Sequence, residues 1–281
     1  MNMNLQGIET SMFYLMLAAY ILGMVFYWVY LGTKNEMIGQ FATIITFAGL
    51  VGNTGAIVLR TIIAHRPPLS NGYEYIVTFC WGIVAVLLFT ELRFKIKALG
   101  SFVMPIPFLL IMFILMAMGP EERIAAAIPP ALKSQWLTFH VITAMFSYGA
   151  FAVSFGLGLM YLIKAAKSAE KSSKASRIPP LETLDELAYK VVGFAFPLLT
   201  LCIITGAIWA NYAWGTYWSW DPKETWSLIT WIIYAGYLHA RLMYGWKGKR
   251  AAWLAVIGFV AVLFTFFGVN YLLPGLHSYA S

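Results

Sequence analysis

Long apolar runs dominate the chain, and short polar stretches separate them. Eight of these runs approach the roughly 20 residues that a helix needs to cross a bilayer. They cover residues 12–31, 41–64, 73–90, 99–118, 137–163, 191–210, 225–245 and 251–273. A backbone in lipid must satisfy its own hydrogen bonds, and the alternating pattern of a barrel strand is absent. The pattern therefore predicts an all-α fold with about eight transmembrane helices in a single membrane domain, residues 1–281.

The composition excludes an ordinary soluble domain. Of the 281 residues, 60% are hydrophobic and 11% are charged, whereas about 25% are charged in a typical soluble domain. Residues 1–11 contain Glu9 but no Lys or Arg, so the first apolar run lacks the basic flank of a cleaved signal peptide and is expected to be retained. Cys80 and Cys202 lie within expected helices and form no CxxC pair, which favours packing as small hydrophobic residues over thiol–disulfide exchange.

Basic residues distinguish the two sides of the membrane. When the loops are assigned alternately from the N-terminus, fourteen of the nineteen Lys and Arg residues fall on the second side. Cytoplasmic loops carry the excess of these residues, so both termini are predicted to lie on the outer face. The basic segment 164–190 is expected to be a flexible cytoplasmic linker near anionic lipid, with a docking site as the alternative. The formal charge of +7 then requires no nucleic-acid partner.

The outer segment before the seventh run is rich in tryptophan. Residues 211–231 are expected to hold a loop and the start of the following helix, and the eighteen positions 214–231 include five tryptophans. Single tryptophans are typical of membrane interfaces. A loop this dense in tryptophan, next to a glycine, also suits the stacking of a large planar ligand. The candidate ligand contacts are Trp214, Trp218, Trp220, Asp221 and Trp226.

The polar residues of this segment also have a structural interpretation. Asp221 is suited to cap the seventh helix, with Pro222 at N1 and Glu224 at N3 of a capping box. Asn71 and Glu74 have the same spacing at the start of the third helix. Capping leaves the tryptophans before Asp221 unexplained.

Four histidines are present, and none lies in an expected cytoplasmic loop. His65, His140 and His277 are expected at the outer face, whereas His239 lies within the seventh helix. A histidine inside a membrane helix suggests a function, although a hydrogen bond to a neighbouring helix is the alternative. Imidazole is a common axial ligand of heme iron. Zinc is the competing metal, but zinc sites usually need three or four protein ligands, and the sequence has no HxxxH, HExxH or CxxC.

Helical spacing predicts two separate sites. His239 lies 17 residues into the expected seventh helix, about 25 Å along its axis, whereas His140 follows a suitable N-cap, Ser134, by about 9 Å. One iron atom cannot bind both histidines, so we expect an outer and an inner site. Ala235 and Gly236, one turn from His239, leave room for a macrocycle. The inner site has no second histidine here, so it is either five-coordinate or completed by another protein.

The sequence WGTYWSWDPKETWSLITW, followed by YLHARL, resembles the WWD signature of the cytochrome c assembly family, in its system II branch. The likeness extends to the turn HRPPLSNGYE and to the histidines on either side of the loop. The resemblance implies that His140 and His277 hold heme b at the outer face. It further implies that His239 belongs to a second heme site within the membrane, whose other ligand comes from a partner of the CcsB (ResB) type.

The resemblance also implies a function. Heme crosses the membrane and is presented at the tryptophan loop to apocytochromes carrying CxxCH, whose thiols form thioether bonds with the heme. Synthase activity is expected only together with the partner, and no residue of this chain is expected to act as a catalytic acid or base. A heme exporter or a CcmC-type delivery protein without synthase activity is the alternative. The expected location is a bacterial plasma membrane with the loop facing the periplasm or exterior, or alternatively a thylakoid membrane.

Two further roles remain open in the sequence. His65 is a candidate heme contact in addition to the three histidines above. Arg60, Arg66 and Arg123 are expected near the outer face, and their charge makes them candidate partners for the heme propionates.

Overall fold

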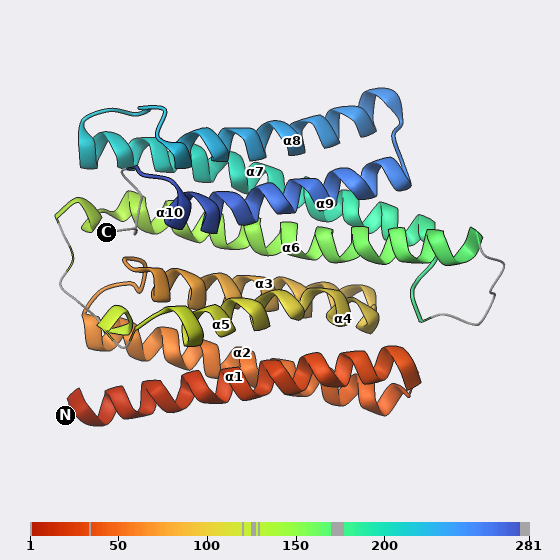
Figure 1. Cartoon of the computed structure of the whole chain (residues 1–281), viewed down its shortest axis with the longest axis horizontal. Helices are drawn as coiled ribbons and strands as arrows, with labels where there is room; N and C mark the ends of the chain where they lie inside the picture. Colours follow the sequence, from red (N-terminus) through yellow and green to blue (C-terminus); the bar gives the residue numbers. More distant parts are fainter. Residues whose placement is uncertain are drawn as a thin grey trace. The chain divides into compact units, whose positions relative to one another are not determined.

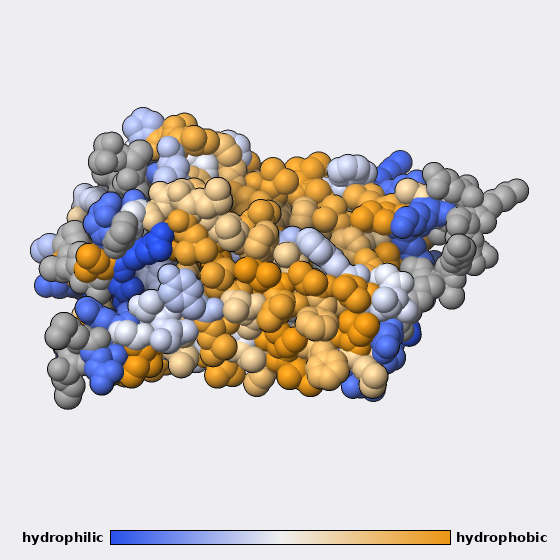
Figure 2. All heavy atoms as spheres, turned by 60° about the horizontal axis from the view of Figure 1, so that its bottom comes forward, coloured by the Kyte–Doolittle hydropathy of each residue, from blue (hydrophilic) through white to orange (hydrophobic). Residues whose placement is uncertain are grey.

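The computed structural model describes residues 2–33, 35–119, 121–124, 128, 130–169 and 177–275. Within these residues the chain is helical and contains no strand. Seven of the described helical segments are long and apolar enough to cross a membrane, judged by length and composition. On the face drawn in Figure 2, hydrophobic residues cover the middle and hydrophilic residues gather toward the two ends. The chain is therefore an all-α polytopic membrane protein, as the apolar runs predict.

The helices form two compact units, residues 1–129 and 130–281 (Figure 1). In unit 1, α1 and α2 pack along their lengths, while α3 packs against α2 and α5. The elements of unit 1 are α1 (Asn2–Thr33), α2 (Glu36–Ala64), α3 (Gly72–Phe94), η1 (Lys97–Leu99), α4 (Gly100–Val103), α5 (Pro105–Ala117) and η2 (Glu121–Arg123).

The fourth apolar run, expected to be one helix, is divided in the structure. α4 ends at Val103 and α5 begins at Pro105. Proline has no N–H to donate to the preceding turn, and its ring clashes with the carbonyl four residues earlier, so the helix is interrupted at Met104. The segment Lys97–Ala117 is still long and apolar enough to make one span.

Unit 2 is a bundle of four long helices followed by two short elements. α6 packs against α7 and α9, and α8 packs against α7 and α9 (Figure 1). The buried rings of Phe151 and Tyr234, with centroids 3.6 Å apart, join α6 to α8. The elements of unit 2 are η3 (Pro130–Leu132), α6 (Gln135–Ala169), α7 (Leu181–Trp214), α8 (Pro222–Tyr244), α9 (Lys249–Leu263), the π-helical turn η4 (Phe264–Gly268) and α10 (Val269–Leu272).

α8 forms where the sequence predicts a helix, but it is not one of the seven apolar segments. It carries several polar side chains, His239 and Arg241 among them. Arg241 makes an ion pair of 2.8 Å with Asp185 of α7, and both side chains are about one-tenth exposed. The charge that α8 brings into unit 2 is therefore compensated by α7.

Helix occupies much of the segment 164–190, for which the sequence predicts a linker. α6 continues to Ala169 and α7 begins at Leu181, because the alanines and lysines of this segment have high helix propensity despite their charge. The ammonium group of Lys164 donates hydrogen bonds to the carbonyls of Ile178 and Pro179, at 2.8 and 2.6 Å. These hydrogen bonds connect the segment before α7 to α6.

Candidate functional site

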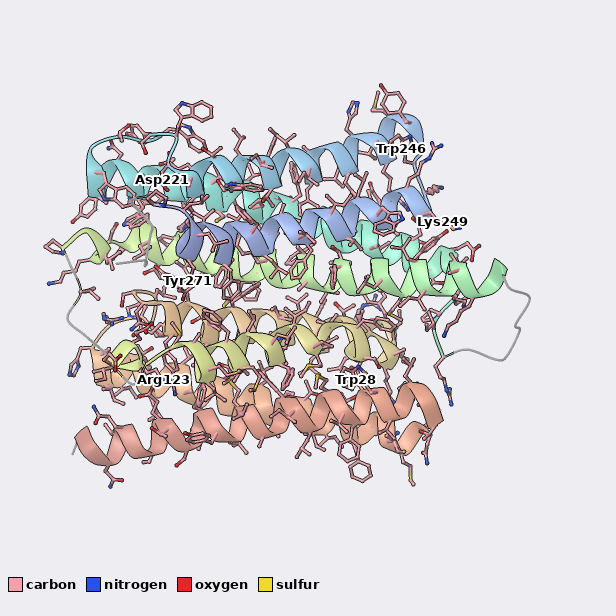
Figure 3. All side chains as sticks on the ribbon, in the orientation of Figure 1. Trp28, Arg123, Asp221, Trp246, Lys249 and Tyr271 are labelled. Carbon is pink, nitrogen blue, oxygen red and sulfur yellow. The ribbon has the colours of Figure 1, made fainter. Side chains whose placement is uncertain are left out.

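The tryptophan loop is short because helices occupy both of its flanks. α7 ends at Trp214, and Gly215 adopts the left-handed conformation, with φ of 77°, while its N–H donates to the carbonyl of Asn211. α8 begins at Pro222, so the loop proper is residues 215–221. Asp221 and Tyr271 lie at this end of unit 2, whereas Trp246 and Lys249 lie at its other end (Figure 3).

The acidic residues of the loop cap α8. The buried carboxylate of Asp221 accepts a hydrogen bond from the backbone N–H of Lys223 at 3.1 Å. The carboxylate of Glu224 accepts from the N–H groups of Asp221 and Ser219, at 3.2 and 2.7 Å. The predicted capping box is confirmed, and it fixes the backbone on both sides of Trp220.

Trp220 is held in an unfavourable backbone conformation. Its φ is 60°, in the left-handed region that a bulky side chain seldom adopts. Such strain costs about 1–3 kcal/mol and persists where the surrounding contacts enforce it. Trp220 is nevertheless 68% exposed, and its ring meets that of Trp218 edge-on at 5.7 Å. The capping box therefore presents two indoles at right angles on the surface of the loop.

The other two tryptophan candidates make different contacts. Trp214 packs edge-on against Trp209 at 4.9 Å, and Trp209 in turn is stacked with His140 at 6.2 Å. Trp226 lies on α8 and packs against Phe264 of η4 at 4.1 Å. Trp214 thus connects the loop to His140, while Trp226 connects it to the π-helical turn.

His140 lies near the start of α6, where the side chain of Ser134 accepts the N–H of Trp136 and confirms the predicted cap. The Nδ1 atom of His140 is 2.7 Å from the carbonyl oxygen of Cys202 on α7. Because a carbonyl oxygen only accepts, Nδ1 carries the proton, and in the neutral ring Nε2 carries the lone pair. Histidines that bind metals usually donate their other ring N–H in this way.

Gly206 makes this approach possible. A Cβ atom at position 206 would lie 2.7 Å from Nδ1 of His140, well inside van der Waals contact. Both cysteines are free and buried, as the sequence predicts. The contribution of Cys202 to the site is its backbone carbonyl.

The start of α8 also contacts α10 and the residues that follow it. Lys223 lies before the predicted span 225–245, and its ammonium group donates to Oδ1 of Asn270 on α10 at 2.8 Å. Burial lowers the pKa of Lys223 to about 8. A Cβ atom at Gly275 would lie 2.6 Å from Oδ1 of Asp221, so the backbone of Gly275 lies against the cap. His277 lies outside the described residues.

His239 lies toward the opposite end of α8 from the loop. Its ring is 5.6 Å from that of Tyr244, and it is exposed together with Gly236 and Met243. No described atom outside the helix lies within 4 Å of a Cβ atom built at Gly236, so the space that the sequence analysis expects beside His239 is open in this chain.

The remaining candidates belong to unit 1. His65 is exposed and caps the end of α2, with φ of 52°. Arg60 pairs with Glu9 at 2.7 Å and Arg66 pairs with Glu74 at 2.8 Å. Asn71 caps α3 by accepting the N–H of Glu74, as predicted.

Three further residues position the site and were not predicted from the sequence. Gly206 could have been predicted, because a glycine in a membrane helix often marks a place where a neighbouring helix packs closely. Asn270 is a polar residue in an apolar run, and no local pattern pairs it with Lys223, 47 residues earlier. Trp209 resembles any other aromatic residue of a membrane helix.

Comparisons with known proteins give a consistent result. Residues 69–277 match the family described as cytochrome C assembly protein. The cytochrome c biogenesis protein CcsA of Guillardia theta is 41% identical, over 94% of this chain and 91% of that protein. Proteins of the same name from Gloeobacter violaceus and Mesostigma viride are 35% and 38% identical. The match to the Gloeobacter violaceus protein covers 93% of this chain and 93% of that protein. The match to the Mesostigma viride protein covers 99% of this chain and 98% of that protein.

A solved structure, the cytochrome c heme lyase CcmF, has a similar fold. The TM-score is 0.70 at 15% identity, and the match covers 96% of this chain. It covers 47% of the CcmF chain, so this chain spans about half the length of that protein.

Proposed function

Because the chain belongs to the cytochrome c assembly protein family, we propose that it holds heme at the tryptophan loop and presents it to apocytochromes. Membership places the chain in cytochrome c biogenesis, where heme is the substrate that must be handled. The observation that carries the proposal is the hydrogen bond from His140 to the Cys202 carbonyl. It directs the lone pair of the imidazole to Nε2, the atom that an iron ligand needs.

The outer heme is bound by His140 and His277, with Trp214, Trp218, Trp220 and Trp226 as the aromatic candidates around it. The exposed indole of Trp220 and the half-buried indole of Trp218 beside it suit contact with a flat macrocycle. Gly275, two residues before His277 in the sequence, lies against Asp221 at the end of the loop. Asp221 contributes by capping α8, since its buried carboxylate accepts a hydrogen bond from the backbone of that helix.

The inner heme is bound by His239 on the exposed face of α8. Gly236 leaves open space on this face, and the second axial ligand comes from a membrane partner of the CcsB (ResB) type. The loop faces the periplasm of a bacterial plasma membrane or the lumen of a thylakoid, because most of the basic residues lie on the opposite side of the membrane.

The chemistry assigned to this chain is positioning. Each thiol of the CxxCH motif adds across a heme vinyl group, so that sulfur forms the thioether bond and its proton ends on the neighbouring vinyl carbon. The histidine of the motif then replaces one axial ligand. The chain orients heme b for this reaction and sets the redox properties of the iron through its ligands.

Heme content of the purified protein tests the outer site. His140→Ala should remove most of the outer heme and change the absorption spectrum of the remainder, whereas Gly193→Ala on α7, whose new Cβ atom meets no other part of the described structure within 4 Å, should leave both unchanged. The proposal fails if His140→Ala retains the heme content and spectrum of the wild type.

Coexpression distinguishes a synthase from an exporter. Cells that produce this chain, its partner and a CxxCH apocytochrome should yield cytochrome with thioether-bound heme. Free heme outside the membrane without covalent product would favour export or delivery.

A further inference from the structure

Unit 1 contains a pocket of about 350 Å³ that the proposed heme sites do not use. It lies where the start of α1 meets the end of α2, and α3 and the end of η2 complete its lining. In Figure 3, Arg123 marks this end of unit 1 and Trp28 marks the other. The volume lies within the usual range of small-molecule sites.

The charged lining of the pocket carries an excess of one positive charge. Nε and Nη2 of Arg60 are both 2.7 Å from Oε1 of Glu9, and both side chains are 8% exposed. This buried pair is neutral as a whole. Arg123 adds a second guanidinium, and no carboxylate among the described residues forms an ion pair with it.

Arg123 has a donor that the described chain does not satisfy. Its Nη2 atom donates to the carbonyls of Ile114 and Met118, at 2.8 and 2.6 Å. Its Nε atom is buried without a hydrogen-bond partner among the described residues. An unmet buried donor is costly, more so when it is charged, and calls for a partner such as a bound ligand.

Beside these charges, the lining combines the apolar side chains Phe13 and Ile63 with two tyrosines and the polar residues Gln6 and Thr10. Tyr14 lines the pocket and is 53% exposed. It continues into the exposed apolar face of α1, which includes Leu15 and Leu22, and α1 is long and apolar enough to span the membrane. A ligand with an anionic head and an apolar tail would therefore use both parts of the lining.

From these features we propose that the pocket binds the phosphate group of a membrane phospholipid. Arginine is well suited to phosphate, because its planar guanidinium forms directed, charge-assisted hydrogen bonds. The guanidinium of Arg123, in the pocket lining, supplies the net positive charge that attracts the phosphate, while Arg60 and Glu9 remain a neutral pair. The acyl chains lie along the exposed face of α1 beside Tyr14.

Native mass spectrometry of the full chain in detergent tests the ligand class. Three probes separate the head from the tail: dioctanoyl phosphatidylglycerol, dioctanoylglycerol without phosphate, and glycerol phosphate without acyl chains. We expect the phospholipid to bind at least 10-fold more tightly than either of the others. Equal binding of glycerol phosphate, or of dioctanoylglycerol, would overturn the assignment.

Two variants locate the site. Arg123→Gln removes the charge and the Nε donor, and Thr10→Phe fills the pocket from an exposed position of its lining. Each should weaken phospholipid binding at least 10-fold. Arg93→Gln, which removes an exposed charge from α3 outside the pocket lining, is the matched control and should bind as the wild type does.

Because Arg123 also caps α5, circular dichroism of each variant checks that the helices remain. Thr10→Phe leaves the hydrogen bonds of Arg123 in place and supplies an independent result. Wild-type affinity in either pocket variant, or an equal loss in Arg93→Gln, would contradict the proposal.

Discussion

Three neighbours on α7 control one imidazole ring. The carbonyl of Cys202 fixes which nitrogen of His140 carries the proton, Trp209 lies parallel to the ring, and Gly206 gives it room. A hydrogen bond from Nδ1 to a carbonyl also raises the basicity of Nε2. The strength of any iron bond at His140 therefore depends on α7.

Gly206→Ala tests this dependence without changing His140. The new methyl group would overlap the imidazole, so the ring must turn away from Cys202. We expect the heme content at the outer site to fall several-fold and its absorption maximum to shift. Gly193→Ala is the matched control on the same helix, because no other part of the structure lies within 4 Å of its new Cβ atom, and it should retain wild-type heme.

Trp220→Gly should separate heme binding from stability. Glycine accepts a φ of 60° without strain, so the relief of strain offsets the entropy that glycine adds to the unfolded chain. We expect the free energy of unfolding to change by less than about 1 kcal/mol, while heme retention falls several-fold. Thermal unfolding and heme content of the same preparation give both values. A large loss of stability would show that Trp220 supports the fold.

At the scale of elements, α8 is fixed at both ends by polar contacts. The capping box and the contact between Lys223 and Asn270 hold its start. At its other end, Asp185 pairs with Arg241 and accepts the N–H of Gly248 at 2.8 Å. One carboxylate of α7 thus joins the end of α8 to the start of α9.

Asp185→Ala should therefore be strongly destabilising. Removing one partner of a buried ion pair leaves the other charge uncompensated and costs about 3–5 kcal/mol. Glu186→Ala removes a neighbouring carboxylate whose ion pair with Lys190 is exposed, and should leave stability almost unchanged. Thermal unfolding in detergent compares the two. Similar midpoints for both variants would contradict this account.

For the whole molecule, the apolar runs predict where the spanning helices lie, because lipid leaves a spanning backbone few alternatives. They do not predict the break at Met104. Local polar patterns predicted the caps at Asn71 and Asp221, since capping depends on neighbours in sequence. The approach of His140 to Cys202 was not predictable, because it depends on how α6 and α7 pack. The sequence also gave no sign of the left-handed backbone at Trp220, which the cap enforces.

Cysteine labelling tests the predicted orientation of the whole chain. Cys80 and Cys202 are buried, so the background should be low. Tyr217→Cys in the exposed part of the loop should react with a membrane-impermeant maleimide added outside intact cells. Lys247→Cys, between α8 and α9, should react only after lysis. Labelling in the reverse order would show that the loop faces the cytoplasm.

The polarity of α8 also affects how the protein enters the membrane during synthesis. An arginine near the middle of an isolated span costs about 2.5–3.5 kcal/mol on insertion scales, and less near its end. α8 carries Arg241 and His239, and its counter-charge is on α7. We therefore expect α7 and α8 to insert as a hairpin that carries the tryptophan loop across. In a glycosylation assay, α8 should insert poorly alone and well behind α7, and less well behind an α7 carrying Asp185→Ala. Efficient insertion of α8 alone would show that the ion pair between Asp185 and Arg241 stabilises the folded protein but does not assist membrane insertion.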